Sequence, residues 1–339
     1  MARRAGATSD MASGRAQRRP ARIVASLALK CSPGRVDRAL PVRFAVLANP
    51  RSGRGRAPSA AEEVVAALHA GGHEVDALIA EQGPEQAAEF TRRACETADR
   101  MVLIGGDGTV GFVLNAVPNP PPLALVPLGT ANLLAHHLKL PRDPAVCARL
   151  AVEGTVLSAD CARLRLHDEH GKQIERWSFL CCGFGPDGEI VRRIAEMRSG
   201  PIHMHEYAGA LAGVATNWNA PAQRIQADDQ ALGEHCFGIA SGVSVYGTGW
   251  WNLGPCDLDD GRWEMFLMPE LTLASAARLA TTATWRSLAD AKGVERRSVH
   301  NLRVEGAARS PVQADGDFIG WTPLELKLGL RQFRIIAPA

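Results

Sequence analysis

The sequence lacks an apolar run of about 18 residues, the length that a helix needs to cross a bilayer. Its longest candidate, residues 23–29, is far shorter and lies between Arg22 and Lys30. The 339 residues include only eight cysteines, too few for a disulfide scaffold, and their spacing fits no common metal site. We therefore expect a cytoplasmic protein with reduced thiols and without a transmembrane segment.

An excess of one charge is also absent from the whole chain, where 38 basic and 36 acidic residues leave a net charge of +2. Residues 1–40 nevertheless carry +7, and the remaining residues carry −5. The mildly acidic body lacks the basic face that nucleic acid requires, so we expect no nucleic-acid partner. The basic tail favours weak attraction to anionic lipid.

The N-terminal segment, residues 1–41, is rich in Arg, Ala, Ser, Gly and Pro. Its low apolar content predicts a disordered basic extension. It also lacks the apolar region of a secretory signal. A start of translation at Met11 or later is an alternative explanation of its composition.

From Val42 the chain alternates apolar strands with helices. We expect strands at residues 42–48, 74–79, 101–104 and 123–126, and helices at residues 60–70, 84–95, 110–117 and 131–138. Alternation at this spacing is typical of parallel strands joined by helical crossovers. The first half of the body is therefore expected to be an α/β domain of the nucleotide-binding type.

After about Thr155 the pattern changes to short β-like stretches separated by turns. We expect strands at residues 159–167, 176–182, 224–227, 236–243 and 263–268, and helices at residues 189–197, 206–217 and 273–291. Short strands with frequent turns indicate a mostly antiparallel β-sandwich. The predicted fold class is thus α/β, with an N-terminal parallel-sheet nucleotide-binding domain and a C-terminal β-sandwich domain.

The strongest chemical signal is the loop Gly105-Gly106-Asp107-Gly108-Thr109, between a strand and a helix. At that position glycines let backbone N–H groups approach a phosphate. Asp107 would repel phosphates unless a divalent cation or an organising hydrogen bond intervened, which indicates a metal-nucleotide complex. A tight turn with Asp107 as the N-cap of the helix is the alternative.

Two further loops lie at equivalent positions. Asn49-Pro50-Arg51-Ser52-Gly53 follows the first strand, and Pro127-Leu128-Gly129-Thr130-Ala131-Asn132 follows the fourth. Open α/β sheets bind ligands at the carboxyl ends of their strands. The three loops together therefore predict one ligand site.

These motifs make the sequence similar to the diacylglycerol kinase catalytic family, which also contains sphingosine and ceramide kinases and bacterial soluble lipid kinases. The resemblance rests on the three loops, the last of which continues to Ala135, and extends over residues 42–339. Three later segments also match the family, namely Gly185-Pro186-Asp187, Pro255 to Gly261, and Asp315-Gly316-Asp317.

The resemblance implies a two-domain enzyme that uses ATP and Mg²⁺, with ATP in the cleft between the domains. Residues 42–155 and about 323–339 would form the ATP-binding domain, and residues 156–322 the lipid-substrate domain. The residues that would surround the nucleotide belong to the three loops: Asn49, Ser52, Gly53, Gly105, Gly106, Asp107, Gly108, Thr109, Gly129, Thr130 and Asn132.

The resemblance also assigns roles to four carboxylates. Asp315 would be the general base that takes the proton from a lipid hydroxyl, although Asp-Gly by itself is typical of a surface β-turn. Asp187 would contact the lipid head group, with an N-cap as the alternative. Asp107 and Asp317 would hold the metal. Leu133 stands where many bacterial relatives have Asp, and Asp317 where the family usually has Glu, so an accessory metal site is left open.

The sequence therefore predicts a lipid kinase that transfers the γ-phosphoryl group of ATP to the hydroxyl of a diacylglycerol-like or sphingoid lipid. It would act at the inner face of the membrane as a peripheral protein, and a homodimer is compatible with the sequence. The alternatives are an NAD or other small-molecule kinase and a catalytically silent lipid or nucleotide sensor. An apolar tunnel beside Asp315 would favour the lipid acceptor, whereas a narrow polar cleft would count against it.

Overall fold

The computed structural model describes residues 40–197, 204–219, 221–247, 249–268 and 272–339. The basic extension expected at residues 1–41 lies almost wholly outside the described residues. Residues 41–339 form a single unit. Within the described ranges, every helix is too short or too polar to cross a membrane.

The first half of this unit is built on parallel strands in the order β2-β1-β3-β4-β17. The first four strands are β1 (Arg43–Ala48), β2 (Glu74–Ile79), β3 (Arg100–Gly105) and β4 (Leu123–Pro127). Only the end of the long strand β17 (Asp317–Ala337) joins them, where Ile335 pairs with Leu123. The predicted parallel sheet is confirmed.

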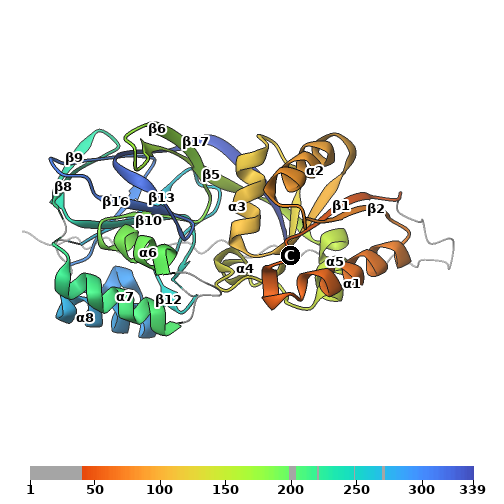
Figure 1. The fold of residues 1–339 in the computed structure, drawn as a ribbon, viewed down its shortest axis with the longest axis horizontal. Helices are drawn as coiled ribbons and strands as arrows, with labels where there is room; N and C mark the ends of the chain where they lie inside the picture. The colour runs from red at the N-terminus through yellow and green to blue at the C-terminus, as the bar shows by residue number, and fades with distance from the viewer. Residues whose placement is uncertain (1–39, 198–203, 220, 248, 269–271) are drawn as a thin grey trace, which may run out of the picture. The chain divides into compact units, whose positions relative to one another are not determined.

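Helices cover both faces of the parallel sheet (Figure 1). One face packs against α1 (Ala57–Ala70) and α5 (Pro144–Glu153), and the other against α2 (Pro84–Thr97) and α3 (Asp107–Ala116). In β3, Val102 and Ile104 face the first pair of helices, while Met101 and Leu103 face the second. Because both faces are buried there, the inner strands β1, β3 and β4 are continuously apolar, whereas the edge strand β2 contains Glu74 and Asp76.

The second half contains two packed layers of mostly antiparallel strands. One layer joins β6, β5, β17, β15, β8 and β9, and the other joins β14, β13, β10, β7 and β16. Leu164, Leu326, Phe184 and Trp263, from both layers, share one core. The predicted C-terminal β-sandwich is therefore confirmed. The strand bounds are β5 (Thr155–His167), β6 (Gln173–Ser178), β7 (Cys181–Phe184), β8 (Gln223–Ala227), β9 (Gln230–His235), β10 (Phe237–Ser241), β13 (Trp263–Met268), β14 (Glu295–Val299), β15 (Asn301–Glu305) and β16 (Pro311–Ala314).

Three helices lie together on the second layer (Figure 1). They are α6 (Pro186–Met197), α7 (Met204–Asn217) and α8 (Leu273–Trp285). The shorter elements are α4 (Leu133–His137), a hairpin of β11 (Val245–Tyr246) and β12 (Trp251–Asn252), and the 3-10 turns η1 (Ser52–Arg54) and η2 (Leu288–Asp290).

Several boundaries predicted from the sequence differ from those in the structure. The strand expected at residues 176–182 is interrupted after Ser178, because the N–H groups of Phe179 and Leu180 bond to a carboxylate instead of a strand. The helix expected at residues 273–291 ends at Trp285. Helix α5 was not expected, although its N-cap Asp143, followed by proline, is a common helix start.

Strand β17 links the two halves. It pairs with β16 and β15 in the sandwich, with β5 along most of its length, and with β4 at its end. The predicted boundary at residues 322 and 323 falls inside this strand, and the division into two domains stays a prediction.

We expect the end of β17 to contribute strongly to stability. Ile335 is fully buried, so Ile335→Ala should lower the free energy of unfolding by about 2–5 kcal/mol through lost burial and a cavity. Leu330 is 46% exposed on the same strand, so Leu330→Ala should change it by about 0.5 kcal/mol or less. Urea denaturation measures both, and equal losses would contradict the expectation.

Candidate active site

The three predicted ligand loops meet at the carboxyl ends of β1, β3 and β4. The N–H of Asn49 donates to the Ile104 carbonyl (3.0 Å), and the N–H of Leu128 donates to the Gly105 carbonyl (2.7 Å). A Cβ added to Gly129 would lie 2.6 Å from the Cα of Gly106. These loops therefore touch backbone to backbone, an approach that only glycine allows.

The side chain of Asn132 is used within its own loop. Its Oδ1 accepts from the N–H of Gly129 (2.9 Å), and its Nδ2 donates to the Gly129 carbonyl (2.7 Å). Asn132 is buried and has a positive φ of 49°, which asparagine tolerates better than most residues. It shapes the loop, so any contribution to ligand binding would be indirect.

Asp107 is also committed to the protein. It is the first residue of α3, and its carboxylate accepts from the N–H groups of Leu133 (2.8 Å) and Leu134 (3.2 Å) at the start of α4. Burial raises the pKa of Asp107, while these two bonds oppose the rise. The expected organising hydrogen bond is thus present, but Asp107 holds a different helix from the one it begins.

The other loop residues differ in their exposure and in their hydrogen bonds. The hydroxyl of Thr109 is buried and has no hydrogen-bond partner among the described residues. Gly108 and Thr130 are exposed, and Ser52 and Gly53 are half-buried at the first loop. Asn49 accepts from the N–H of Arg51 (3.1 Å), which shapes that loop.

Asp315 occupies the turn between β16 and β17. Asp315 and Gly316 have φ values of 52° and 88°, as a two-residue hairpin turn with two left-handed residues requires. The β-turn expected from Asp-Gly is therefore correct. The turn nevertheless directs the Asp315 side chain back into the protein, where it contacts the segment from Ser178 to Cys181.

Four donors surround the Asp315 carboxylate. Oδ1 accepts from the Ser178 hydroxyl (2.7 Å) and from the N–H groups of Leu180 (2.9 Å) and Cys181 (3.1 Å). Oδ2 accepts only the longer bond from Phe179 (3.2 Å) among the described residues, which leaves it capacity for another donor. Burial raises the pKa of Asp315 to about 6, although the four bonds oppose the rise.

Asp187 lies close to this turn and is almost fully buried. Its carboxylate accepts from the hydroxyl of Tyr246 and from Nε2 of Gln313 (2.8 Å). The alternative reading of Asp187 as an N-cap is wrong, because its bonds go to other elements. Gln313 also accepts from the N–H of Gly316 (3.0 Å), so it joins Asp187 to the Asp315 turn. Burial raises the pKa of Asp187 to about 6.

A cavity of about 360 Å³ connects these groups. Asp315, Asp187 and Asp107 contribute to its wall, together with Ala131 and Leu133 from the third loop and α4. The rest of the wall is mostly apolar and comes from α6, α7, α8, β10 and the β11–β12 hairpin: Ile190, Val191, Leu211, Phe237, Ile239, Trp250, Trp251, Met268, Ala276, Leu279, Ala280, Ala283 and Leu288. A mostly apolar cavity, rather than a narrow polar cleft, therefore lies beside Asp315.

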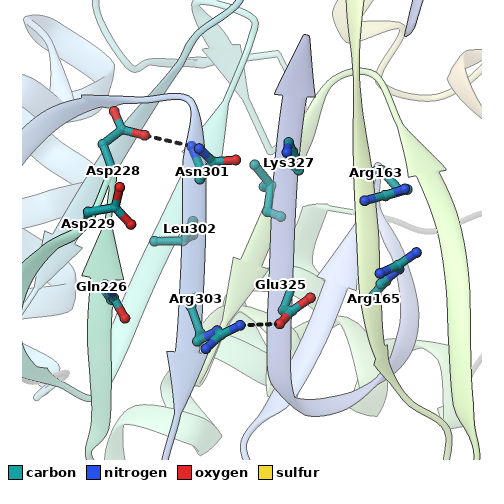
Figure 2. Close-up of a pocket in the computed structure, with 11 residues that line it drawn as sticks. Arg163, Arg165, Gln226, Asp228, Asp229, Asn301, Leu302, Arg303, Glu325 and Lys327 are labelled. Carbon is teal, nitrogen blue, oxygen red and sulfur yellow. Dashed lines mark hydrogen bonds and ion pairs between the residues drawn. The ribbon is translucent and has the colours of Figure 1, made fainter. Parts of the chain in front are cut away.

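A second cavity, of about 330 Å³, lies on the outer face of the β-sandwich and has a different character (Figure 2). Charged side chains from neighbouring strands line it. Arg303 pairs with Glu325 (2.6 Å), and Arg165, at its border, pairs with Glu175 (2.9 Å). This surface is a ladder of ion pairs and offers little to an apolar ligand.

The residues expected to hold Mg²⁺ do not form a metal site. Both oxygens of Asp107 are hydrogen-bonded to backbone, and Asp317 is exposed, with Arg176 4.0 Å away. The described ranges contain no group of three or more His, Cys, Asp or Glu side chains placed to hold a metal. This arrangement does not fit a metal ion held by the protein alone, and Mg²⁺ stays a prediction.

Comparisons with known proteins place this site among kinases. Residues 43–164 match the family described as the diacylglycerol kinase catalytic domain. A diacylglycerol kinase of Staphylococcus saprophyticus is 24% identical over 304 residues, which cover 86% of this chain and 95% of the relative. A diacylglycerol kinase of Mycobacterium tuberculosis is 24% identical over 310 residues, covering 91% and 99%.

Solved structures share the fold. A putative diacylglycerol kinase from Bacillus anthracis matches with a TM-score of 0.68 and 19% identity, covering 88% of this chain and 98% of that one. A yeast NADH kinase matches with a TM-score of 0.54 and 13% identity, covering 88% and 84%. At these identities the likeness concerns the fold alone.

Sequence reasoning missed the residues that hold the two buried carboxylates. Ser178, Tyr246 and Gln313 lie 59 to 137 residues from the aspartates they contact. No local pattern marks such partners. The break between β6 and β7 could have been a signal, since Ser178-Phe179-Leu180 turns its N–H groups toward Asp315.

The contact between the second and third loops predicts that alanine substitutions at two glycines change the free energy of unfolding by different amounts. Gly129→Ala should lower the free energy of unfolding by about 1–3 kcal/mol, because the new methyl group meets the Gly106 backbone. Gly108→Ala should leave stability nearly unchanged, because nothing lies within 4 Å of the new methyl group. Denaturant midpoints compare the two, and equal effects would show that the loops do not pack as described.

Proposed function

We propose that this protein is an ATP-dependent lipid kinase that phosphorylates the hydroxyl of a diacylglycerol-like or sphingoid lipid. The observation that supports it best is the mostly apolar cavity that has Asp315 and Asp187 on its wall. A cavity of this size with a few convergent polar groups is typical of a small-molecule site. Its lining suits acyl chains, and its carboxylates suit a hydroxylated head group.

The nucleotide would bind where the three loops meet. The first N–H groups of α3 have no partner within the helix, and the helix dipole favours an anion there. The unpaired hydroxyl of Thr109 is buried beside these groups and could donate to a phosphate oxygen. Gly108 and Thr130 are exposed at the same place, so phosphates could approach the backbone closely.

Asp315 would act as the general base. The lipid hydroxyl donates its proton to Oδ2 of Asp315, and the hydroxyl oxygen forms a bond to the terminal phosphorus of ATP. The bond from that phosphorus to the bridging oxygen breaks, and ADP leaves. A carboxylate with a pKa of about 6 is ionised at neutral pH yet basic enough to accept this proton.

Asp187 would recognise the lipid head group. Tyr246 and Gln313 fix its orientation at the cavity wall, and Gln313 ties it to the turn of the base. A hydroxyl donating to Asp187 would therefore lie near the Asp315 turn. An NAD acceptor, which the shared fold of NADH kinase would allow, is disfavoured by the apolar lining.

Replacing the base should separate turnover from binding. Asp315→Asn keeps the shape of the turn but removes proton acceptance, so kcat should fall by about 10²–10⁴-fold. ATP binding should be unchanged, because Asp315 lies outside the three loops. Radiolabelled ATP with diacylglycerol, sphingosine and NAD measures turnover, and equilibrium titration measures binding.

Asp229 provides a matched control for that experiment. It lies in the β8–β9 turn with a φ of 66° and lines only the outer, charged cavity. Asp229→Asn should leave kcat unchanged. Full activity of Asp315→Asn would remove the general-base role, and phosphorylation of NAD in preference to every lipid would reject the lipid acceptor.

The raised pKa values of Asp315 and Asp187 predict an unusually steep fall of activity on the acid side of the pH profile. Burial raises the pKa of both carboxyls to about 6. Asp315 must be ionised to accept the proton, and Asp187 must be ionised to accept from Tyr246, Gln313 and a head-group hydroxyl without presenting a proton of its own. As pH falls below about 6, kcat/KM should therefore fall with a limiting slope near two on logarithmic axes. Asp187→Asn should lower activity and reduce that slope to one. A limb centred near pH 4 in the wild type would contradict both assignments.

A further inference from the structure

Two tryptophans are unusually exposed for residues of their size. Trp250 is 71% exposed and Trp285 is 82% exposed. Large aromatic side chains in water are generally found where a partner or a membrane interface covers them. Trp177 and Trp263, by contrast, are half-buried and buried.

The two exposed tryptophans lie on neighbouring elements. Trp250 directly precedes β12, and Trp285 is the last residue of α8. Nδ2 of Asn252 donates to the carbonyl of Arg286 (2.9 Å), which joins these two elements immediately beside both tryptophans. Both exposed indoles therefore lie next to the same contact between elements, although they are 35 positions apart in the sequence.

This surface borders the apolar cavity. Trp250 and Trp251 line it from the β11–β12 hairpin, and α8 lines it through Ala276, Leu279, Ala280 and Ala283. Trp285 does not line the cavity, so a substrate inside the cavity would not cover its exposed ring. A lipid that leaves a bilayer for the cavity would pass this rim.

The charges nearby are compatible with a lipid surface. Arg278 lies two turns before Trp285 on the exposed face of α8, and Arg286 follows Trp285 directly. Neither arginine forms an ion pair within the part of the chain that the structure describes. Asp290 is exposed in the next turn, so the positive charge is modest and the tryptophans are the main feature.

We propose that Trp250 and Trp285, with Arg278 and Arg286 beside them, form the surface that docks on the bilayer and brings the cavity mouth to the lipid. Indole rings have an apolar body and a polar N–H, and they settle at the boundary between head groups and acyl chains. The purpose of this docking surface rests on the proposed function as a lipid kinase. Its test measures vesicle binding and does not require kinase activity.

The test uses the full chain and phosphatidylcholine vesicles without ATP or diacylglycerol. Neutral vesicles remove the contribution of the basic residues 1–40, so the tryptophans are measured alone. Trp285→Ala and Trp250→Ala should each weaken vesicle binding by about tenfold in co-sedimentation, because each loses an aromatic ring from the interface. Leu330→Ala, which removes a partly exposed apolar side chain from β17, should bind like the wild type.

Two results would overturn the proposal. In one, Trp285→Ala and Trp250→Ala bind vesicles as the wild type does. In the other, Trp285→Ala converts a dimer to a monomer in analytical ultracentrifugation while vesicle binding is unchanged, which would assign the surface to a second copy of the chain.

Activity on a water-soluble, short-chain diacylglycerol separates this proposal from the proposed function. Trp285→Ala should keep that activity, because Trp285 lies outside the cavity wall, and should lose activity only on vesicles. If the wild type phosphorylates no lipid while its vesicle binding still depends on Trp285, the proposed function fails and the docking surface stands.

Discussion

The antiparallel ladder between β5 and β17 is the constraint on which the rest of the structure depends. β17 begins two residues after Asp315 and ends beside β4, the strand that leads into the loop of Gly129. Strand β17 thus runs from the turn of the proposed base, where it pairs with β16, to the strand that leads into a nucleotide loop, and it pairs with β5 over most of this length. Phe179, which donates to Asp315, packs edge-on against Phe333 of the same strand (5.8 Å). The base and the loops are therefore held by the same element.

Asp107, Asp187 and Asp315 show how the fold accommodates carboxylates away from solvent. Burial opposes ionisation in each case, and each carboxylate is met by donors that oppose the rise in pKa. Asp107 receives N–H groups of α4, Asp187 receives a hydroxyl and an amide, and Asp315 receives N–H groups and a hydroxyl. Asp107 stabilises the start of α4. The other two keep a pKa near neutrality beside an apolar cavity, the combination that a base for a lipid hydroxyl needs.

The sequence predicted the core elements well where periodicity was strong. The strands at residues 43–48 and 74–79 are buried or paired as expected, because apolar runs bounded by glycine and proline are reliable local signals. It failed where a side chain from afar competes with local structure, as at Phe179 and Leu180, whose N–H groups leave the strand for Asp315. It also did not identify the hydrogen-bond partner of Asp107. The N-cap alternative assumed its own helix, whereas the partner is α4, 26 residues later.

The sequence by itself determined the fold class, the three glycine loops and the resemblance to diacylglycerol kinases, because these depend on local spacing, backbone freedom and short motifs. Only the tertiary structure decided which carboxylates are buried, which donors they meet, and that an apolar cavity lies beside Asp315. It also decided that Trp250 and Trp285 are exposed on two elements that contact each other. The physical reason is the same in each case: burial and hydrogen bonding between residues far apart in the chain are set by packing, and neither leaves a mark on the neighbouring sequence.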